Sequence, residues 1–312
     1  MRYKRPISAY GSLFRRKQAI QKISLAIIIL LLVSFAPFVY LKLQGRNVNE
    51  RRELRENFES GAYEASYNQS REMLREKPLD FFLLSINGFS SYQLAISQIN
   101  SFDTLYYIDN CIWSLRKAML FNESNSDGRI FYVLGKAYYY KGQGYGDLAV
   151  KYLERARAVS YMAADIPEYL GLAYAAVKDY HSSIAAFSLA LAANDASDIL
   201  LLSIARSYMA MDELEPSRAY LVRCLEITRD SRIVAAARLL LGNIMYKIGD
   251  FRGAEAEYEK ALEENGEIAE AHFQLGELYA MGGDIARARA EWRRAFRIDP
   301  TFEPARNRLN TQ

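Results

Sequence analysis

Few residues in this sequence of 312 residues could do chemistry by themselves. Only two histidines, His181 and His272, and two cysteines, Cys111 and Cys224, are present. The chain has no HExxH zinc motif, no GxxxxGK[ST] phosphate loop, no CxxC pair and no GxSxG nucleophile motif. We therefore predict no catalytic residue, no metal site and no cofactor, and expect a protein that is not an enzyme.

A group of arginines near the carboxyl end is the most strongly charged motif that could bind a partner. In RARAEWRRAFR, residues 287–297, Arg289, Arg293 and Arg297 share one face of a helix. Glu291 and Asp299 are expected to balance part of this charge. We interpret the stripe as the solvated face of a terminal helix, with a binding face as the alternative.

The elements that would position these residues repeat along the chain. The segment GELYAMGGDIARARAEWRRAFRIDP, residues 276–300, reads as two short helices around a turn of two glycines. The pair Leu275-Gly276 returns 34 residues upstream as Leu241-Gly242, and further steps of 37, 34 and 36 residues reach earlier copies. The earlier pairs are Ile204-Ala205, Leu170-Gly171 and Leu134-Gly135. Five copies of a helix-turn-helix unit are therefore predicted.

The glycine at the eighth position of the unit needs a packing reason, because glycine inside a helix costs about 1 kcal/mol relative to alanine. Close approach of two antiparallel helices provides that reason. Small residues recur at positions 20 and 27, which are Ala288 and Ala295 in the last copy. Large residues at positions 11 and 24, Tyr279 and Trp292 there, are expected to fill the space beside them.

This pattern resembles the tetratricopeptide repeat (TPR), a helix-turn-helix unit of about 34 residues. The resemblance covers residues 129–302 as five repeats and implies an all-α solenoid wound as a right-handed superhelix. Two degenerate TPR-like units are expected over residues 44–128, the second of them elongated, since Gly88 and Ala118 are 30 residues apart instead of 19. Residues 303–312 are expected to be the remnant of a polar cap at the carboxyl end.

The two cysteines fall where a second helix of the unit requires a small buried residue. Cys111 and Cys224 are about three repeats apart, far beyond the limit of about 7 Å between the Cα atoms of a disulfide. We expect two free thiols, which suits a bacterial periplasm better than a disulfide-rich extracellular module.

The resemblance also implies a binding groove on the concave side, built from positions 2, 5, 9, 12 and 13 of each first helix. At these positions the sequence predicts an aromatic and cationic strip, and Tyr and Arg are frequent interface hot spots. The residues of the strip are Arg129, Tyr132, Lys136, Tyr139, Tyr140, Arg206, Met209, Asn243, Tyr246, Lys247 and Phe273. The unit over residues 164–197 contributes Asp165, Glu168, Leu172 and Ala175 instead. The lysine and asparagine clamp of some family members is not predicted, since Leu239 stands where the lysine would be.

The segment ISLAIIILLLVSFAPFVYL, residues 23–41, has nineteen residues without a charge. As a helix this length matches the hydrocarbon core of about 30 Å. We expect a single transmembrane helix over residues 23–43, with a buried core helix and a cleaved signal peptide as the alternatives. Pro37 directly follows the best small-residue cleavage site and argues against cleavage.

The charges that flank this segment predict its orientation. Residues 1–22 carry seven basic residues and no acidic one, whereas residues 42–59 carry a net charge of +1. The positive-inside rule places the tail over residues 1–22 in the cytoplasm and the repeats in the periplasm of a bacterium with this chain in its inner membrane. Without the seven charges of the tail, the net charge of +3 becomes −4, so no nucleic acid is expected as a partner.

Together these features predict a non-catalytic, membrane-anchored TPR scaffold that binds other proteins, with oligomerisation left open. The layout is similar to that of periplasmic TPR proteins that organise envelope machines, including the collars of periplasmic flagellar motors. A chaperone-like or translocon-associated module that holds translocating polypeptides is the alternative. A mitochondrial import receptor would need the repeats in the cytosol, against the charge bias.

Overall fold

The computed structural model describes residues 48–121, 127–193 and 197–310. Within these ranges the chain is helical and has no strand. The predicted basic tail and the predicted transmembrane helix over residues 23–43 lie outside the described residues. Among the helices that are described, none is both long enough and apolar enough to span a bilayer.

The described helices follow one another as antiparallel hairpins after a helix over residues 48–59. The amino-terminal helices are α2 (Tyr63–Glu76), α3 (Phe81–Ser97) and α4 (Ser101–Met119). The pairs that follow are α5 (Gly128–Lys141) with α6 (Gly146–Ala158), α7 (Ile166–Ala176) with α8 (Tyr180–Ala193), α9 (Asp198–Ala210) with α10 (Leu214–Ile227), α11 (Ser231–Lys247) with α12 (Phe251–Glu264), and α13 (Ala269–Met281) with α14 (Ile285–Ile298). The last helix is α15 (Glu303–Asn310).

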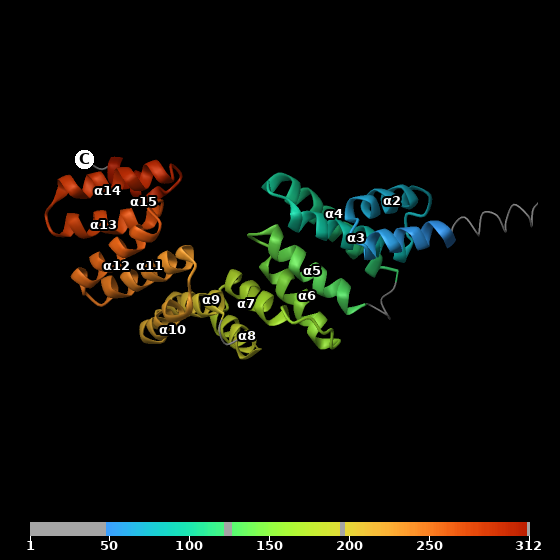
Figure 1. The fold of residues 1–312 in the computed structure, drawn as a ribbon, viewed down its shortest axis with the longest axis horizontal. Helices are drawn as coiled ribbons and strands as arrows, with labels where there is room; N and C mark the ends of the chain where they lie inside the picture. The colour runs from blue at the N-terminus through green and yellow to red at the C-terminus, as the bar shows by residue number, and fades with distance from the viewer. Residues whose placement is uncertain (1–47, 122–126, 194–196, 311–312) are drawn as a thin grey trace, which may run out of the picture.

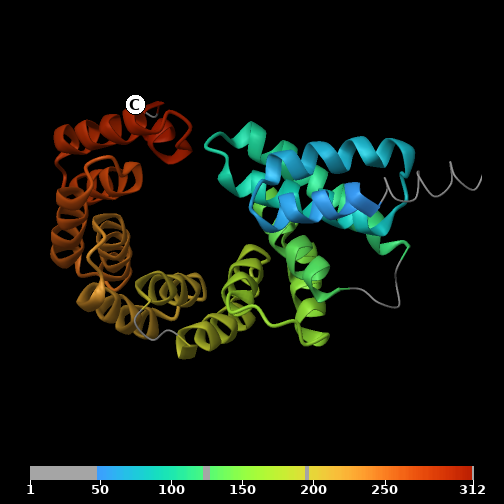
Figure 2. The same cartoon turned by 45° about the vertical axis from the view of Figure 1, so that its right-hand side comes forward.

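The hairpins stack side by side into a solenoid (Figure 1). Figure 2 shows that this solenoid curves, so that α4 near one end and the carboxyl-terminal helices at the other turn toward each other. Several first helices contact the first helix of a neighbouring hairpin: α5 meets both α3 and α7, and α9 meets α11. No contact of similar extent joins neighbouring second helices in the described chain. The first helices therefore line the concave side of the curve.

Close approach at the eighth position of the unit holds each hairpin together. A Cβ atom added to Gly171 would lie 2.5 Å from the ring of Phe187, and one added to Gly276 would lie 2.5 Å from the ring of Trp292. An added Cβ on Gly242 would overlap the ring of Tyr258 in the same way. In each hairpin the glycine faces the large residue at position 24. The packing predicted from the repeat is thereby confirmed.

Serine at position 20 adds a hydrogen bond to this packing in two hairpins. Ser183 donates to the carbonyl oxygen of Gly171, and Ser217 donates to that of Ala205, both at 2.9 Å. Both serines are fully buried. A buried hydroxyl is tolerated at this position because it bonds to the backbone of the facing helix.

The elongated unit is a single hairpin with longer helices. Its helices α3 and α4 have 17 and 19 residues, whereas α13 and α14 have 13 and 14. Gly88 of α3 faces Leu115 of α4, as positions 8 and 24 do elsewhere. Asn87 is buried beside this contact, donating to Ser70 of α2 at 2.9 Å and accepting from Ser114 of α4 at 2.8 Å.

Two turns test the expected spacing of the repeat. The sequence predicts that GQGYG, residues 142–146, lengthens the turn between α5 and α6, and this turn has four residues, 142–145, against three, 177–179, between α7 and α8. The step of 37 residues from Ile204 to Leu241 predicts three extra residues in the turn around residues 228–232, but the structure places them in α11, which has 17 residues. Asp230 caps this helix by accepting from the backbone N–H of Arg232. Because of this cap, α11 begins at Ser231, earlier than the repeat predicts.

The residues predicted as a remnant cap form α15, which packs on α14. Phe302, just before this helix, meets Phe273 of α13 with ring centroids 5.6 Å apart. Ala305 is fully buried, and Arg308 donates to Glu277 of α13 at 2.9 Å. The short helix thus covers the apolar end of the stack, as a solenoid requires.

Candidate protein-binding groove

The predicted groove residues all lie on first helices, those that line the concave side. Five of them, Arg129, Tyr132, Lys136, Tyr139 and Tyr140, are on α5. Arg206 and Met209 are on α9, Asn243, Tyr246 and Lys247 are on α11, and Phe273 is on α13. The contacts of these residues divide the strip into separate parts.

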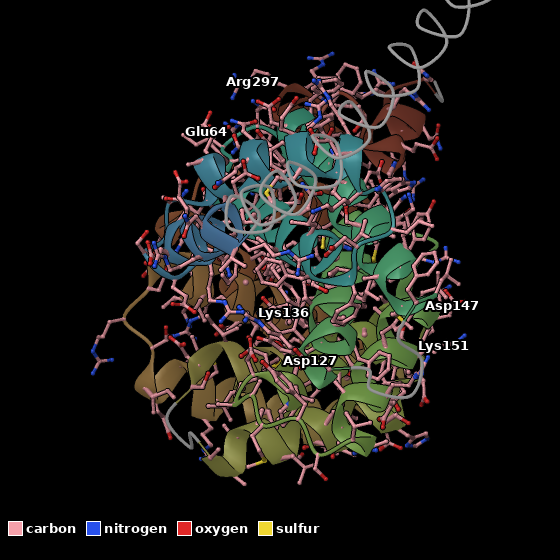
Figure 3. The ribbon with its side chains drawn as sticks, turned by 90° about the vertical axis from the view of Figure 1, so that its right-hand side faces the viewer. Glu64, Asp127, Lys136, Asp147, Lys151 and Arg297 are labelled. Atoms are coloured by element: carbon pink, nitrogen blue, oxygen red, sulfur yellow. The ribbon has the colours of Figure 1, made fainter. Side chains whose placement is uncertain are left out.

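Lys136 is at the centre of the part on α5, with only 8% of the residue exposed. Its Nζ donates to Asp165 Oδ2 at 2.7 Å and to the hydroxyl of Tyr132 at 3.0 Å. The Tyr132 hydroxyl in turn donates to Asp165 at 2.8 Å. Figure 3 shows Lys136 well inside the array, whereas Lys151 and Arg297 lie at its edge. The ammonium group therefore joins α5 to the start of α7.

Aromatic rings surround this lysine and extend across three first helices. The Nζ of Lys136 lies 4.2 Å from the ring centroid of Tyr169 on α7. Tyr140 and Tyr169 share a hydrogen bond of 2.8 Å between their hydroxyls, and Tyr139 meets Tyr169 edge to face. Tyr92 of α3 approaches Tyr140 at 6.3 Å between ring centroids. We call these five residues the tyrosine cluster: Tyr92, Tyr132, Tyr139, Tyr140 and Tyr169.

Sequence reasoning missed two members of the tyrosine cluster. Tyr92 stands four residues after Gly88, which is the groove position 12 once Gly88 is taken as position 8. Because the spacing of that unit is elongated, its repeat positions could not be numbered from the sequence. Tyr169 falls at position 6 of its unit, beside the groove position of Glu168, and only the neighbouring helix shows that it belongs to the cluster.

Burial controls the ionisation of these phenols. It is the main cause that raises the pKa of Tyr92, Tyr132, Tyr139 and Tyr169. The hydrogen bond to Asp165 raises the pKa of Tyr132 further, and the bond to Tyr140 does the same for Tyr169. These hydroxyls therefore stay protonated at neutral pH and can act as hydrogen-bond donors.

We expect the fold to lose stability as the pH rises above about 10. The pKa of these tyrosines is higher in the folded chain than in the unfolded chain, so their contribution is complete below pH ~10 and is lost as the pH approaches their folded values. Phenolate absorbance and helical circular dichroism, recorded in one alkaline titration, measure this. The same titration in denaturant gives the pH at which the tyrosines ionise in the unfolded chain. If all tyrosines of the folded chain ionise at that same pH while the helices stay intact, the described burial is contradicted.

Arg129, the other cation of α5 in the predicted strip, rests on aromatic rings. Its guanidinium lies 4.5 Å from the ring centroid of Phe89 and 5.1 Å from that of Phe58. Such stacking holds the side chain in place while its donors stay available.

The two predicted residues of α9 differ in their surroundings. Met209 is half-buried against the apolar core. Arg206 is exposed and makes no hydrogen bond or ion pair with any residue that the structure describes. Arg206 is therefore a cation on the groove side whose donors a partner could use.

The predicted residues of α11 and α13 are already engaged with other residues of the chain, within their own hairpin or in a neighbouring one. Asn243 accepts from Tyr258 at 2.8 Å and donates to Glu270 at 3.1 Å, and Lys247 pairs with Asp212. Tyr246 packs edge to face on Phe251. Phe273 is covered by Phe302 in the packing of the carboxyl-terminal cap described above. The structure thus brings the α5 residues together and leaves those of α11 and α13 outside the tyrosine cluster.

The expected charge balance of the arginine stripe on α14 is corrected by the structure. Arg289, Arg293 and Arg297 are exposed, but Glu291 is buried and accepts from His272 at 2.7 Å. Asp299 accepts from Thr301 instead of pairing with the stripe. The sequence could not show this, because His272 comes from α13 and draws Glu291 inward.

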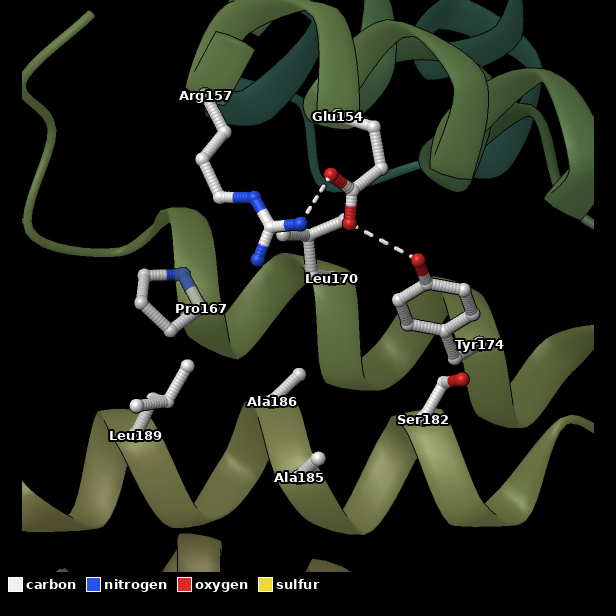
Figure 4. A pocket seen from close by; sticks show the side chains of 9 residues that line it. All are labelled: Glu154, Arg157, Pro167, Leu170, Tyr174, Ser182, Ala185, Ala186 and Leu189. Carbon is white, nitrogen blue, oxygen red and sulfur yellow. Dashed lines mark hydrogen bonds and ion pairs between the residues drawn. The ribbon is translucent and has the colours of Figure 1, made fainter. Parts of the chain in front are cut away.

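One hollow between hairpins is lined by both polar and apolar side chains. Figure 4 shows this hollow, of about 210 Å³, between α6, α7 and α8, where Glu154 pairs with Arg157 and accepts from Tyr174. Burial, followed by this hydrogen bond, raises the pKa of Tyr174 to about 12. Ala185 and Leu189 of α8 line the opposite wall. The hollow can take a single side chain and is smaller than a typical ligand pocket.

His272 and the two cysteines are held in structural roles, whereas His181 is exposed. The other ring nitrogen of His272 meets the carbonyl oxygen of Gly266 at 3.2 Å. Both cysteines are buried and free, and burial raises the pKa of Cys224 to about 11. No group of histidine, cysteine or acidic residues suited to a metal ion occurs in the described ranges.

Comparison with known proteins supports the TPR class. Residues 232–301 match the family model described as tetratricopeptide repeat. The crystal structure of the C-terminal part of a TPR repeat-containing protein from Cytophaga hutchinsonii covers 84% of this chain and all of that chain, with 16% identity and a TM-score of 0.56. A tetratricopeptide repeat protein from Parabacteroides merdae covers 84% of this chain and 98% of that chain, with 16% identity and a TM-score of 0.57. No curated protein sequence matches the chain significantly.

These likenesses establish the fold as an all-helical, TPR-like solenoid. Solenoids of this class generally mediate contacts between proteins and are typically non-catalytic. The nature of the partner has to be argued from the surface of this chain.

Proposed function

We propose that this chain is a non-catalytic scaffold whose concave side binds a segment of a partner protein. The observation that carries the proposal is the tyrosine cluster on α3, α5 and α7, with the exposed Arg206 farther along the same side. Tyrosine and arginine contribute more than other residue types to binding at protein interfaces.

The geometry favours binding because the tyrosine cluster is preorganised. Hydrogen bonds to Asp165 and Lys136 fix Tyr132, and the hydroxyl pair fixes Tyr140 against Tyr169. A side chain that is already ordered loses little conformational entropy when a partner binds. Tyr140 is 39% exposed, so part of this ordered surface is open to a partner.

We further propose that the chain is anchored in a bacterial inner membrane by residues 23–41, with its tail in the cytoplasm and its repeats in the periplasm. The support is the uncharged segment and the excess of basic residues before it. A reporter fused after Gln312, of a kind that works only outside the cytoplasm, tests this. Activity of that reporter is expected, and activity of only a cytoplasmic reporter at the same position would overturn the orientation.

Within this proposal the partners are subunits of an envelope complex, such as the collar of a periplasmic flagellar motor. Mild crosslinking in cells, followed by isolation of the full chain from membranes, is expected to recover a large complex of defined composition. Recovery of the chain alone would count against a scaffold. Broad binding of unrelated short peptides would instead favour a chaperone-like or translocon-associated module.

A further inference from the structure

A run of exposed apolar side chains follows α4 along its length. It includes Ile99 in the preceding turn, which is fully exposed, and Phe102, which is 82% exposed. The full set is Ile99, Phe102, Leu105, Tyr106, Trp113, Leu120 and Phe121. Along the sequence elsewhere in the described chain, large exposed apolar residues occur singly or in pairs. Contiguous patches of this kind mark interaction sites more often than scattered residues do.

This face of α4 is not part of the core of the hairpin. Ile108, Cys111 and Leu115, on the opposite face, are buried and pack toward α3. As a second helix, α4 lies on the side away from the groove, and its 19 residues exceed the 13 of the next second helix, α6. The excess length leaves part of its outer face without a neighbouring helix to cover it.

A hollow of about 540 Å³ opens on this face near the end of α4. Its apolar walls are Ile112, Trp113 and Leu120. The Trp113 side chain is 58% exposed, and the Nζ of Lys117 lies 4.5 Å from its ring centroid. An apolar side chain that entered here would be covered on several sides.

The rim of the hollow is positively charged. Arg116, Lys117 and Lys141 supply three cations, and Asp109 supplies the single carboxylate, which bonds to Lys141 at 2.7 Å. Arg116 also interacts with the hydroxyl of Tyr138, which leaves Lys117 as the cation best placed for a newcomer. Cations around an apolar hollow are complementary to an apolar side chain flanked by carboxylates.

We propose that the outer face of α4 binds an acidic amphipathic segment of a partner protein, with one apolar side chain in the hollow beside Trp113. The apolar stripe runs along several turns of α4, a geometry suited to a second helix laid against it. The carboxylates of that segment face Lys117 and its neighbours. This surface is separate from the concave groove, so the chain can hold two partner segments at once.

A lipid surface fits the same face less well. The hollow is walled by Ile112, Trp113 and Leu120, and a walled hollow favours a discrete side chain over a flat interface. The experiment below therefore distinguishes binding to a lipid surface from binding to a peptide segment.

The test uses the full chain in neutral-lipid bicelles with Trp292→Phe, which leaves Trp113 as the sole tryptophan. The probe is a labelled amphipathic helical peptide with leucines on one face and glutamates beside them. We expect saturable binding by fluorescence anisotropy together with a blue shift of Trp113 emission. A peptide with lysines in place of the glutamates should bind at least about tenfold more weakly.

Variants locate the contact. Trp113→Ala should weaken binding of the acidic peptide by about tenfold or more, whereas Ile285→Ala, which truncates an equally exposed apolar residue on α14, should not. Lys117→Glu should weaken binding of the acidic peptide and strengthen binding of the basic peptide. Neither Trp113 nor Lys117 is buried in the core, so circular dichroism should show unchanged helix content in both variants.

Several results would overturn the proposal. These are absence of saturable binding, equal affinity for the acidic and basic peptides, and binding that Trp113→Ala leaves intact. A blue shift of Trp113 without peptide, seen only in bicelles of anionic lipid, would assign the face to the membrane. Concentration-dependent dimers abolished by Trp113→Ala would assign it to a second copy of the chain.

Discussion

The Gly242→Leu variant is expected to unfold at a clearly lower temperature and denaturant concentration than the natural chain. Its free energy of unfolding should fall by about 3 kcal/mol, the upper end of the range for overpacking. A Cβ atom at this position overlaps the ring of Tyr258, which is itself fully buried between the helices. The leucine can be accommodated only if α11 and α12 move apart.

Gly266→Leu is the matched control for this substitution. Gly266 is exposed, and an added Cβ would meet nothing closer than the carbonyl oxygen of Leu262 at 3.8 Å. Unfolding followed by circular dichroism should give nearly the natural midpoint for this control. An unchanged midpoint for Gly242→Leu would mean that the repeat frame, and with it the assignment of groove positions, is misplaced.

Loss of partner association is the second large effect that we expect. Replacing Tyr139, Arg206 and Tyr246 together by alanine should abolish recovery of the complex that carries the natural chain. Loss of one hot-spot residue commonly costs about 2 kcal/mol, or roughly thirtyfold in affinity. Arg206 makes no hydrogen bond or ion pair with any described residue, and Tyr139 and Tyr246 are half-buried, so the fold should survive.

The matched control is the triple substitution Arg289→Ala, Arg293→Ala and Arg297→Ala on α14. These side chains are exposed and lie outside the first helices that line the groove. Partner recovery should be retained in this control. If binding persists in the groove variant and disappears in the control, the arginine stripe is the true interface.

The repeat in the sequence was sufficient to predict the helical hairpins and their packing. Glycine at position 8 and a large residue at position 24 are local signals, because the two residues belong to one hairpin and meet wherever that hairpin forms. Gly171 with Phe187 and Gly276 with Trp292 illustrate this. A pattern with a fixed period carries such information directly.

The contacts between hairpins could not be predicted in the same way. Asp165, at the start of the next hairpin, stands 29 residues after Lys136, and the repeat does not predict that these two residues meet. Such pairs depend on how much one hairpin rotates relative to the next. For the same reason the sequence did not separate Phe273, which the carboxyl-terminal cap covers, from Arg206, which is free to bind.

The exposed face of α4 went unnoticed because periodic packing arguments concern buried positions. Its signal is the length of the helix together with large apolar residues where a solvated second helix would carry charges. Trp113 and Phe102 show it most clearly. If the elongated unit is taken as an ordinary hairpin with longer helices, its sequence shows large apolar residues at the solvent-facing positions of α4.

Site-specific photo-crosslinking tests the central claim, that a partner lies in the groove, most directly. A photoreactive amino acid would replace Arg206 in one version of the full chain and Arg289 in another, and crosslinked products from living cells would be mapped by mass spectrometry. We expect a crosslink to one defined segment of a partner from position 206 and none from position 289. Crosslinks from position 289 alone would contradict binding in the groove and place the interface on α14.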